Sequence, residues 1–579
     1  MKLLRIKITD PKGFRSLASG FEYHFRTEWK MQEDLANSDF EPFVCAGRNG
    51  SGKSNLLEAL ASIFFQLEVQ RVRRNFLPES FDEVTEYAPN GFELEYLMPL
   101  GIHSDRKISV PVMISKKPGQ PPEIQWVDTT GGVFREADEA EREFLLPAYI
   151  LGYSSGENEI LSLPFFKMRF VQFDEYWGCL RNLHPYSGRP DARMAYLDRE
   201  FSQAILLSNL LFQPSEVVAA YSGDIGLRAI TSFRIILKQR ASLSPDQQYE
   251  FGPAVPNARN LEEMVEQHPY LDSAFDEALG YATYTNVLVL LRTTVEALKR
   301  CATCWSSDEK SDTLTLDYWV NEATRDAFRA NFGSALQLFQ SLQVLLNLNL
   351  YSVSDDLKAD LYKSSSHYAN ETIPVLPSDM RIMRFKEFYV TKAGVDQPLL
   401  LKELSDGEHQ LLHSLGLCML FRGTRSLFLL DEPETHFNPD WRAQFISRLR
   451  RCLSLEGFDE TDFVCMPEML ITTHTPFLIS DSKPDKVLIF KKEDSGEVTI
   501  EHPDYNTLGA SINKITMKTF EKTETVGGVA NSMIQDFRKR FENGEDPATL
   551  IDEIDQKLGD SVEKFLLIKA ILGRVESPS

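Results

Sequence analysis

The 579-residue sequence predicts an α/β protein with one split head, a large insertion and a C-terminal extension. Short apolar runs between polar turns, as expected for strands, occupy residues 1–150 and 381–500. Apolar residues at helical spacing dominate 151–380 and return in 501–579. The two strand-rich segments are therefore expected to form the head, with a mainly helical insertion between them and a helical extension behind them.

The composition is typical of a soluble globular protein, with 42% apolar and 25% charged residues. No apolar run reaches the roughly 18–20 residues needed to cross a membrane. Lys7 and Asp10 interrupt the N-terminal run before a signal-peptide core could form. Seven cysteines are sparse and odd in number, which does not suggest a disulfide framework. We therefore expect a cytoplasmic protein without a membrane partner.

The net charge of −23 argues against nucleic-acid binding over the whole surface. Two local clusters could still form a basic groove, although solvated helix faces are the preferred interpretation of both. The clusters comprise Arg71, Arg73 and Arg74, and Arg442, Arg448, Arg450 and Arg451.

The segment "GRNGSGKS" has the pattern G-x-x-x-x-G-K-[ST], follows the strand-like "FVCA" and opens a helix. In a phosphate-binding loop of this kind, glycines let the backbone wrap the phosphates of ATP. Lys53 then reaches the terminal phosphates, and Ser54 can bind Mg²⁺. The predicted ATP-binding residues are Gly47, Arg48, Asn49, Gly50, Ser51, Gly52, Lys53, Ser54 and Asn55.

Two further apolar strands end in polar residues. "SLFLLDE" ends in Asp431, placed to hold Mg²⁺ with Ser54, and in Glu432, placed to polarise an attacking water. "MLITTH" ends in His474, which could contact the γ-phosphate or hold the attacking water. Glu432 and His474 are therefore the predicted catalytic residues.

The stretch "LSDGEHQLL" predicts a loop that opens directly into a helix. Such a helix start offers free backbone N–H groups and a partial positive charge to an anion. Ser405 as N-cap and Glu408 at the third helical position would also suit a simple helix cap. The residues of this second predicted phosphate-binding segment are Ser405, Asp406, Gly407 and Glu408.

The order of these motifs resembles that of ABC-type ATPases, so the predicted fold is a split ABC-type P-loop ATPase head. The resemblance implies that residues 405–408 form the signature motif, which binds the ATP of a second subunit in a head-to-tail dimer. It also implies that Asp440, in "NPDW", is the D-loop acid at the dimer interface. One subunit's helix N-terminus would then bind the γ-phosphate of its partner, so dimerisation would depend on ATP.

More closely, the chain resembles the SMC/RecF-like branch, through "LLRIKITDPKGFRSL", "GRNGSGKSN" and "LSDGE". "DEPETHFNPDW" and "ITTHTPFLISD" are most similar to AAA-family ATPases of bacterial anti-phage operons. These include restriction-system-associated ATPases and the PtuA-type ATPase of Septu systems, some of which accompany retrons. The resemblance implies a homodimer or higher homo-oligomer, a separate effector such as an HNH nuclease, and binding of DNA or a retron DNA–RNA hybrid.

The sequence departs from the family pattern at the signature, where Asp406 replaces a glycine found in many relatives. This difference could weaken hydrolysis. For the Q-loop, Gln172 is the nearest residue, and a structural glutamine is an equal alternative. Cys301 and Cys304 form a C-x-x-C pair, interpreted as inert thiols because one pair supplies only two of four zinc ligands.

The leading hypothesis is a defence ATPase whose nucleotide state controls a partner nuclease. A DNA-repair or chromosome-maintenance clamp of RecF/SMC type is the alternative, and an ATP-bound scaffold with little hydrolysis is the third. The extension from about residue 505 is expected to dock a partner. Its apolar residues are Leu550, Ile554, Leu558, Phe565 and Leu566.

Overall fold

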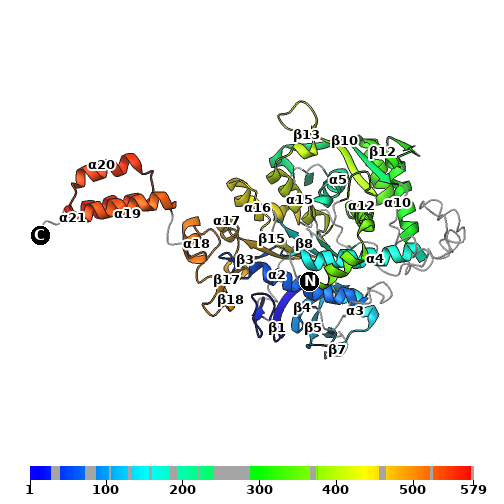
Figure 1. Ribbon diagram of the computed structural model, residues 1–579, viewed down its shortest axis with the longest axis horizontal. Helices are drawn as coiled ribbons and strands as arrows, with labels where there is room; N and C mark the ends of the chain where they lie inside the picture. The colour runs from blue at the N-terminus through cyan, green and yellow to red at the C-terminus, as the bar shows by residue number, and fades with distance from the viewer. Residues whose placement is uncertain are drawn as a thin grey trace.

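Figure 1 shows the computed structural model of the chain. The structure describes residues 1–27, 40–71, 87–103, 106–127, 132–155, 160–182, 192–196, 198–214, 217–218, 222–238, 287–308, 310–311, 313–364, 373, 376–454, 465–521 and 526–575.

The head is built around a seven-stranded sheet in which both predicted halves meet. Its strands, in spatial order, are β18 (Val498–Glu501), β17 (Val487–Lys492), β3 (Phe43–Gly47), β16 (Glu468–Thr473), β15 (Ser426–Asp431), β8 (Tyr149–Ser154) and β9 (Met194–Tyr196). All neighbouring strands are parallel except β17 and β18. Parallel strands place their carboxyl ends at one edge, where open α/β sheets bind ligands. The sheet thus joins strands that begin at residues 43 and 426, from the two segments expected to form the head.

Helix α2 (Lys53–Arg71) lies between this sheet and a second one. The second sheet is antiparallel in the order β2 (Glu22–His24), β1 (Lys2–Ile8), β4 (Phe92–His103), β5 (Arg106–Lys116), β6 (Glu123–Val127) and β7 (Phe134–Glu136). Leu57 and Leu60 of α2 share one buried cluster with Ile6 and Leu94 of the second sheet and Leu429 of the first. This common core fixes the start of α2, and hence the loop before it, against the central sheet.

The insertion contains a five-stranded sheet that the sequence analysis did not predict. Its order is β11 (Cys304–Asp308), β12 (Thr313–Trp319), β10 (Leu227–Lys238), β13 (Met383–Lys392) and β14 (Leu399–Leu400). Its buried face packs on helices α5 (Ser202–Phe212), α10 (Val287–Cys301), α11 (Glu322–Phe332) and α12 (Ala335–Asn347). The strong helical periodicity of the flanking segments favoured a helical prediction for the whole region. In addition, the alternation of buried and exposed side chains in these strands is interrupted where the register shifts between β10 and β13.

Two predicted boundaries differ from the structure. The boundary at 150 falls inside β8, which pairs with β15 in the head sheet, and β9 also joins that sheet. The boundary at 381 precedes β13, which belongs to the sheet of the insertion. Short apolar strands buried on both faces cannot be assigned to a sheet from periodicity, because pairing is a long-range property.

The remaining helices connect these layers. They are α3 (Glu139–Leu145), α4 (Ser162–Asn182), α13 (Asp355–Lys363), α15 (Asp406–Leu420), α16 (Pro439–Cys452), α17 (Pro476–Ser480) and α18 (Ile512–Thr519). Single 3₁₀ turns occur at Arg199–Phe201, Gly223–Ile225, Leu348–Ser352, Leu401–Glu403 and Pro484–Lys486. None of the described helices is both long enough and apolar enough to cross a membrane.

The C-terminal extension divides into two parts. Residues up to Glu521 pack on the head, since Ile515 and Phe520 belong to the same buried cluster as the central sheet. Helices α19 (Gly528–Glu542), α20 (Pro547–Lys557) and α21 (Val562–Val575) lie apart from the head in Figure 1 and form a cluster of their own. The predicted start of a docking segment at about 505 therefore includes residues that complete the head.

Candidate nucleotide site

The P-loop lies at the carboxyl end of β3 and leads directly into α2. Gly47, Gly50 and Gly52 have φ angles of 145°, 75° and 99°, which side chains other than glycine rarely adopt. A Cβ at Gly47 would lie 2.5 Å from the carbonyl oxygen of Phe490 in β17. The glycines therefore allow the loop to turn tightly, so that its backbone N–H groups can face an anion.

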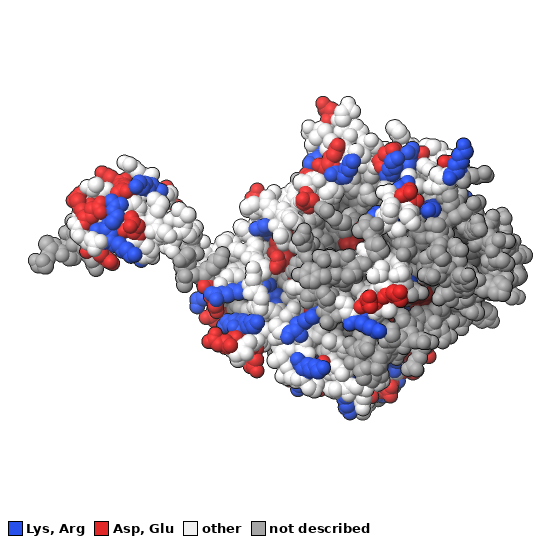
Figure 2. Space-filling view, viewed as in Figure 1, with Lys and Arg blue, Asp and Glu red and all other residues white. Residues whose placement is uncertain are grey.

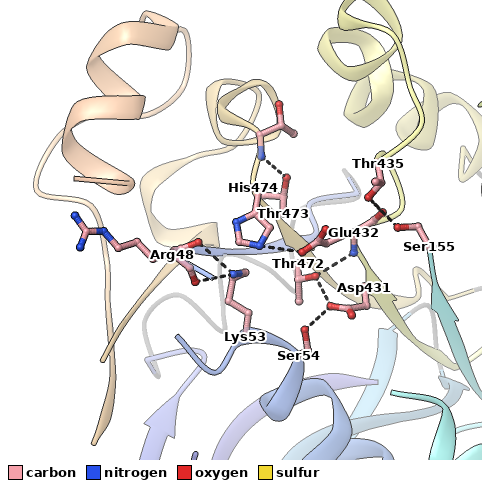
Figure 3. Close-up of polar contacts among 12 residues, drawn as sticks. Arg48, Lys53, Ser54, Ser155, Asp431, Glu432, Thr435, Thr472, Thr473 and His474 are labelled. Atoms are coloured by element: carbon pink, nitrogen blue, oxygen red, sulfur yellow. Dashed lines mark hydrogen bonds and ion pairs between the residues drawn. The ribbon is translucent and has the colours of Figure 1, made fainter. Parts of the chain in front are cut away.

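Lys53 points back into this loop (Figure 3). Its ammonium donates hydrogen bonds to the carbonyls of Gly47 and Arg48, each at 3.1 Å. The side chain is buried, and burial lowers the pKa of Lys53 below its usual value, opposed by the charges of Glu432 and Asp431. Among the described residues, the buried Ser51 hydroxyl has no hydrogen-bond partner. A buried cation beside an unsatisfied hydroxyl in a glycine cradle fits a bound polyphosphate.

Ser54 and Asp431 meet although they are 377 positions apart. The Ser54 hydroxyl donates to Asp431 Oδ1 at 2.7 Å, and Thr472 Oγ1 donates to the same oxygen at 2.5 Å (Figure 3). Asp431 is fully buried, and this burial raises its pKa despite the two hydrogen bonds. A divalent cation would remove that penalty, and a hydroxyl with a carboxylate is the ligand pair that P-loop proteins offer Mg²⁺.

Glu432 lies against His474, with Glu432 Oε1 and His474 Nε2 2.9 Å apart (Figure 3). The hydrogen bond from His474 is the main cause that lowers the pKa of Glu432. Glu432 has a φ of 48°, a left-handed conformation that costs a non-glycine residue free energy. Its backbone N–H donates to the hydroxyl of Thr472 at 3.0 Å. The strand ends thus hold the carboxylate of Glu432, on a strained backbone, beside the predicted metal ligands.

A second glutamate of the same loop was missed by the sequence analysis. Glu434 is 3% exposed, and its Oε1 accepts a short hydrogen bond from the Thr473 hydroxyl, while Oε2 has no described partner. Burial raises the pKa of Glu434 to about 7. The letters "DEPETH" contain this glutamate, but nothing local in them distinguishes a buried carboxylate from an exposed one.

We predict that Glu434→Gln stabilises the protein at alkaline pH and leaves its stability unchanged at low pH. The pKa of Glu434 is higher in the folded chain than the value of about 4.3 expected in the unfolded chain. The contribution of the protonated carboxyl to stability is therefore complete below pH ~4.5 and is lost as pH rises through ~7, and ionisation of the buried group then costs about 4 kcal/mol. The uncharged amide of the variant removes this loss.

Thermal unfolding of both proteins at pH 5 and pH 8 tests this prediction. The gap in Tm between variant and wild type should widen at pH 8, and the exposed Glu497→Gln should show no such widening. An equal gap at both pH values would contradict the assignment.

The predicted signature motif forms the start of α15. Ser405 is the N-cap of a capping box: its Oγ accepts from the N–H of Glu408, whose carboxylate accepts from the N–H of Ser405. A Cβ at Gly407 would lie 2.7 Å from the carbonyl oxygen of His436, so this position requires glycine. Glu408 also pairs with Lys392 at the end of β13. The helix cap predicted as the simple alternative is thus present, and its residue Ser405 and the following Asp406 are both exposed.

Asp440 lies exposed in the first turn of α16 and makes no hydrogen bond or ion pair with the described residues. The arginines of this helix divide between two environments, because Arg450 and Arg451 are exposed as on a solvated face whereas Arg448 is buried. Arg448 is 1% exposed, and Arg442 and Arg450 donate to backbone carbonyls of Glu434, Thr435 and Phe40. Of the other cluster, Arg71 pairs with Glu68, and positions 73 and 74 lie outside the described residues.

Arg48 makes a contact that the sequence analysis also missed. Its guanidinium donates to the carbonyls of Phe520 and Glu521 at 3.3 and 3.2 Å and pairs with the Glu521 carboxylate at 3.3 Å. These residues end the part of the extension that packs on the head. Arg48 therefore connects the P-loop to the segment that leads to α19. No local sequence motif predicts this contact.

The remaining predicted positions are Gln172, the cysteine pair and the two asparagines of the P-loop segment. Gln172 is buried about three turns into α4, and its amide has no described hydrogen-bond partner. Cys301 is buried and Cys304 is exposed, and the described residues contain no group of three or more metal-ligating side chains. Asn55 donates to Ser16 at 2.6 Å, while Asn49 is exposed in the loop.

The chain is similar to one family of known proteins and to several solved structures. Residues 312–480 match the family described as "AAA domain, putative AbiEii toxin, Type IV TA system". Similar solved structures include the SMC head domain from Thermotoga maritima, at 11% identity and a TM-score of 0.29, covering 87% of this chain and 100% of that one. The recombination mediator protein RecF–ATPrS of the RecFOR pathway is 14% identical with a TM-score of 0.28, covering 86% and 97%.

The family match covers less than a third of the chain, and it contains the signature helix, the acidic strand end and His474. The strand order of the central sheet, with the P-loop, Asp431 and His474 at adjacent strand ends, defines the fold of the head. The head is an α/β P-loop fold in which strands from both parts of the chain share one sheet, split by a large insertion.

Proposed function

We propose that the chain binds and hydrolyses ATP and that its nucleotide state controls a partner effector in anti-phage defence. The observation that carries the catalytic part is the contact between Ser54 and Asp431, with the Glu432–His474 pair beside it. A phosphate cradle, a metal-ligand pair and a general base within one strand edge are the parts that phosphoryl transfer to water requires.

In this proposal Ser54 and Asp431 hold Mg²⁺, which would neutralise charge on the phosphates when bound. The Lys53 ammonium gives up its hydrogen bonds to the two loop carbonyls and donates to phosphate oxygens instead. Glu432 accepts the proton of the attacking water, and the lowered pKa of its carboxyl keeps it ionised for this role. His474 orients Glu432 through their hydrogen bond and can reach toward the γ-phosphate.

The exposed start of α15 and the exposed Asp440 support a head-to-tail dimer. Ser405 and Asp406 lie at a helix N-terminus, where backbone N–H groups favour an anion. In this dimer they would bind the γ-phosphate held by the P-loop of a second subunit, and Asp440 would cross the interface. ATP would then be required for closure, and hydrolysis would loosen it.

The defence role is supported by the family description, which names a putative AbiEii toxin of a type IV TA system, and by the sequence resemblance to ATPases of anti-phage operons. We propose a separate nuclease, of HNH type, as the effector. The test is affinity purification of the native complex from its host. A nuclease subunit that co-purifies supports the proposal, whereas DNA-repair or chromosome-maintenance partners would favour the clamp alternative.

The unit formed by α19–α21 is the proposed docking element for that partner. Leu550, Ile554 and Leu558 are buried inside the unit, so they are not the docking face. Val562, Phe565, Leu566 and Leu572 are 61%, 65%, 52% and 47% exposed on the other face of α21. Separations of three and four residues from Val562 to Phe565 and Leu566, and of seven from Phe565 to Leu572, place them along one side of the helix.

We expect deletion of residues 526–579 to leave ATP binding and the fold of the head intact while abolishing capture of the partner. The cut removes the separate cluster and retains Ile515, Phe520 and the Arg48 contacts. Co-purification and ATP binding of the truncated chain are the measurements. The double variant F565S/L566S should also lose the partner, and R538S/K539S on α19 should retain it. A truncated, folded chain that still captures every partner would contradict the docking role.

A further inference from the structure

Described helices cover one face of the five-stranded sheet of the insertion, and none of the described helices packs on the other face, here called the open face. Phe233, Leu316 and Tyr318 are buried on the covered face, where the Phe233 and Tyr318 rings stack at 4.3 Å. Phe328 of α11 packs against both rings. Side chains of alternate residues lie on the opposite face. The nearest exposed residue in β12 is Trp319, which is 70% exposed.

The open face combines aromatic and basic side chains. The register places Trp319 of β12 and Tyr389 of β13 on either side of Ser232 in β10. The following rows carry four cations, Arg234, Lys238, Arg384 and Lys386, and three acidic residues, Asp308, Asp317 and Glu387. Figure 2 shows blue side chains, with some red among them, gathered over the region of β10, β12 and β13. This positive excess occurs in a chain with a net charge of −23.

A cavity of about 590 Å³ adjoins the end of this sheet. It is lined by Arg228 at the start of β10 and by Arg325 and Arg329 of α11, which begins three residues after Trp319. Glu322 is its acidic residue. Arg325 donates to the Leu210 carbonyl at 2.7 Å and lies 3.8 Å from Glu322, and Arg329 pairs with Asp326 at 3.2 Å. Arg228 is exposed and makes no hydrogen bond or ion pair with a described residue.

We propose that this surface binds single-stranded nucleic acid, with backbone phosphate in the arginine cavity and an unpaired base stacked on Trp319. Guanidinium groups match phosphate geometry, and an exposed indole offers a stacking platform to any base. A base face is available only when the base is unpaired, so duplex is excluded from the stacking contact. The site goes beyond the proposed ATPase function, because it lies in the insertion and uses none of the nucleotide-site residues.

The test uses the full-length chain and a fluorescein-labelled, mixed-sequence 20-nucleotide single strand, with anisotropy as the readout. EDTA is present and ATP is absent, so failure of ATP chemistry cannot alter the result. Trp319→Ala should weaken binding roughly ten-fold, as expected for loss of one stacked base. The Trp319 backbone makes the local hydrogen bonds, so the fold does not depend on its side chain. The matched control is Trp305→Ala, because Trp305 is 55% exposed on the same sheet but lies over Lys299 of the covering helix α10.

The double variant R228A/R329A should reduce the slope of log K against log salt by about 1.4, the value for two lost phosphate contacts on a single strand. The matched control R538A/K539A removes two exposed cations on α19 and should leave the slope unchanged. Wild-type binding by both site variants would overturn the proposal. So would equal affinity for the 20-base-pair duplex, or displacement of the strand by a mononucleotide at the affinity of the strand itself.

Discussion

Lys53→Ala is expected to weaken ATP binding at least about 100-fold, since it removes the cation directed at the terminal phosphates. Hydrogen bonds to charged groups contribute about 1.5–3 kcal/mol each, and the ammonium has two such bonds available once it leaves the loop carbonyls. The measurement is titration calorimetry with ATP and Mg²⁺. Hydrolysis and any activity of the partner should fall with binding.

The matched control is Lys492→Ala, an exposed lysine at the end of the neighbouring strand β17. Because the alanine variant leaves the Gly47 and Arg48 carbonyls without their donor, its thermal unfolding should be measured as well. If the alanine variant is unstable, Lys53→Met, which keeps the aliphatic part of the side chain, replaces it in the ATP-binding measurement. A folded Lys53 variant with wild-type affinity for ATP would contradict the P-loop assignment.

Glu432→Gln is expected to retain ATP while slowing hydrolysis by about 10²–10⁴-fold, the usual contribution of a general base. The amide keeps the size of the carboxylate and can still contact His474, but it cannot accept the proton of water. Phosphate release under single-turnover conditions measures the loss. The exposed Glu493→Gln should hydrolyse ATP at the wild-type rate. Wild-type turnover in the Glu432 variant would exclude this residue as the base.

The same variant tests the head-to-tail dimer. With hydrolysis blocked, ATP should hold two subunits together, and gel filtration should show a dimer with ATP and not without it. Ser405→Arg in the Glu432→Gln background should prevent this ATP-dependent dimer, because a bulky cation occupies the exposed helix start. A dimer unaffected by this change would contradict the role of residues 405–408 in trans.

Much of the nucleotide site was predictable because its parts are local. The P-loop needs glycines at fixed spacing followed by a helix, and the structure has them between β3 and α2. The Ser405–Glu408 cap likewise depends on residues three positions apart. Asp431 and His474 follow apolar runs that form β15 and β16. The parallel pairing of these strands then brings both side chains to one edge.

The sequence by itself therefore determined the motifs, the split of the head and the helical character of the extension. Only the tertiary structure decided that β8 joins the head sheet, that Glu434 is buried, that Arg48 contacts Phe520 and that Trp319 lies on an open sheet face. The physical reason is that caps, turns and glycine loops depend on neighbours in the chain. Burial, strand pairing and the pKa of a carboxyl depend on groups that are distant in sequence and brought together only by packing.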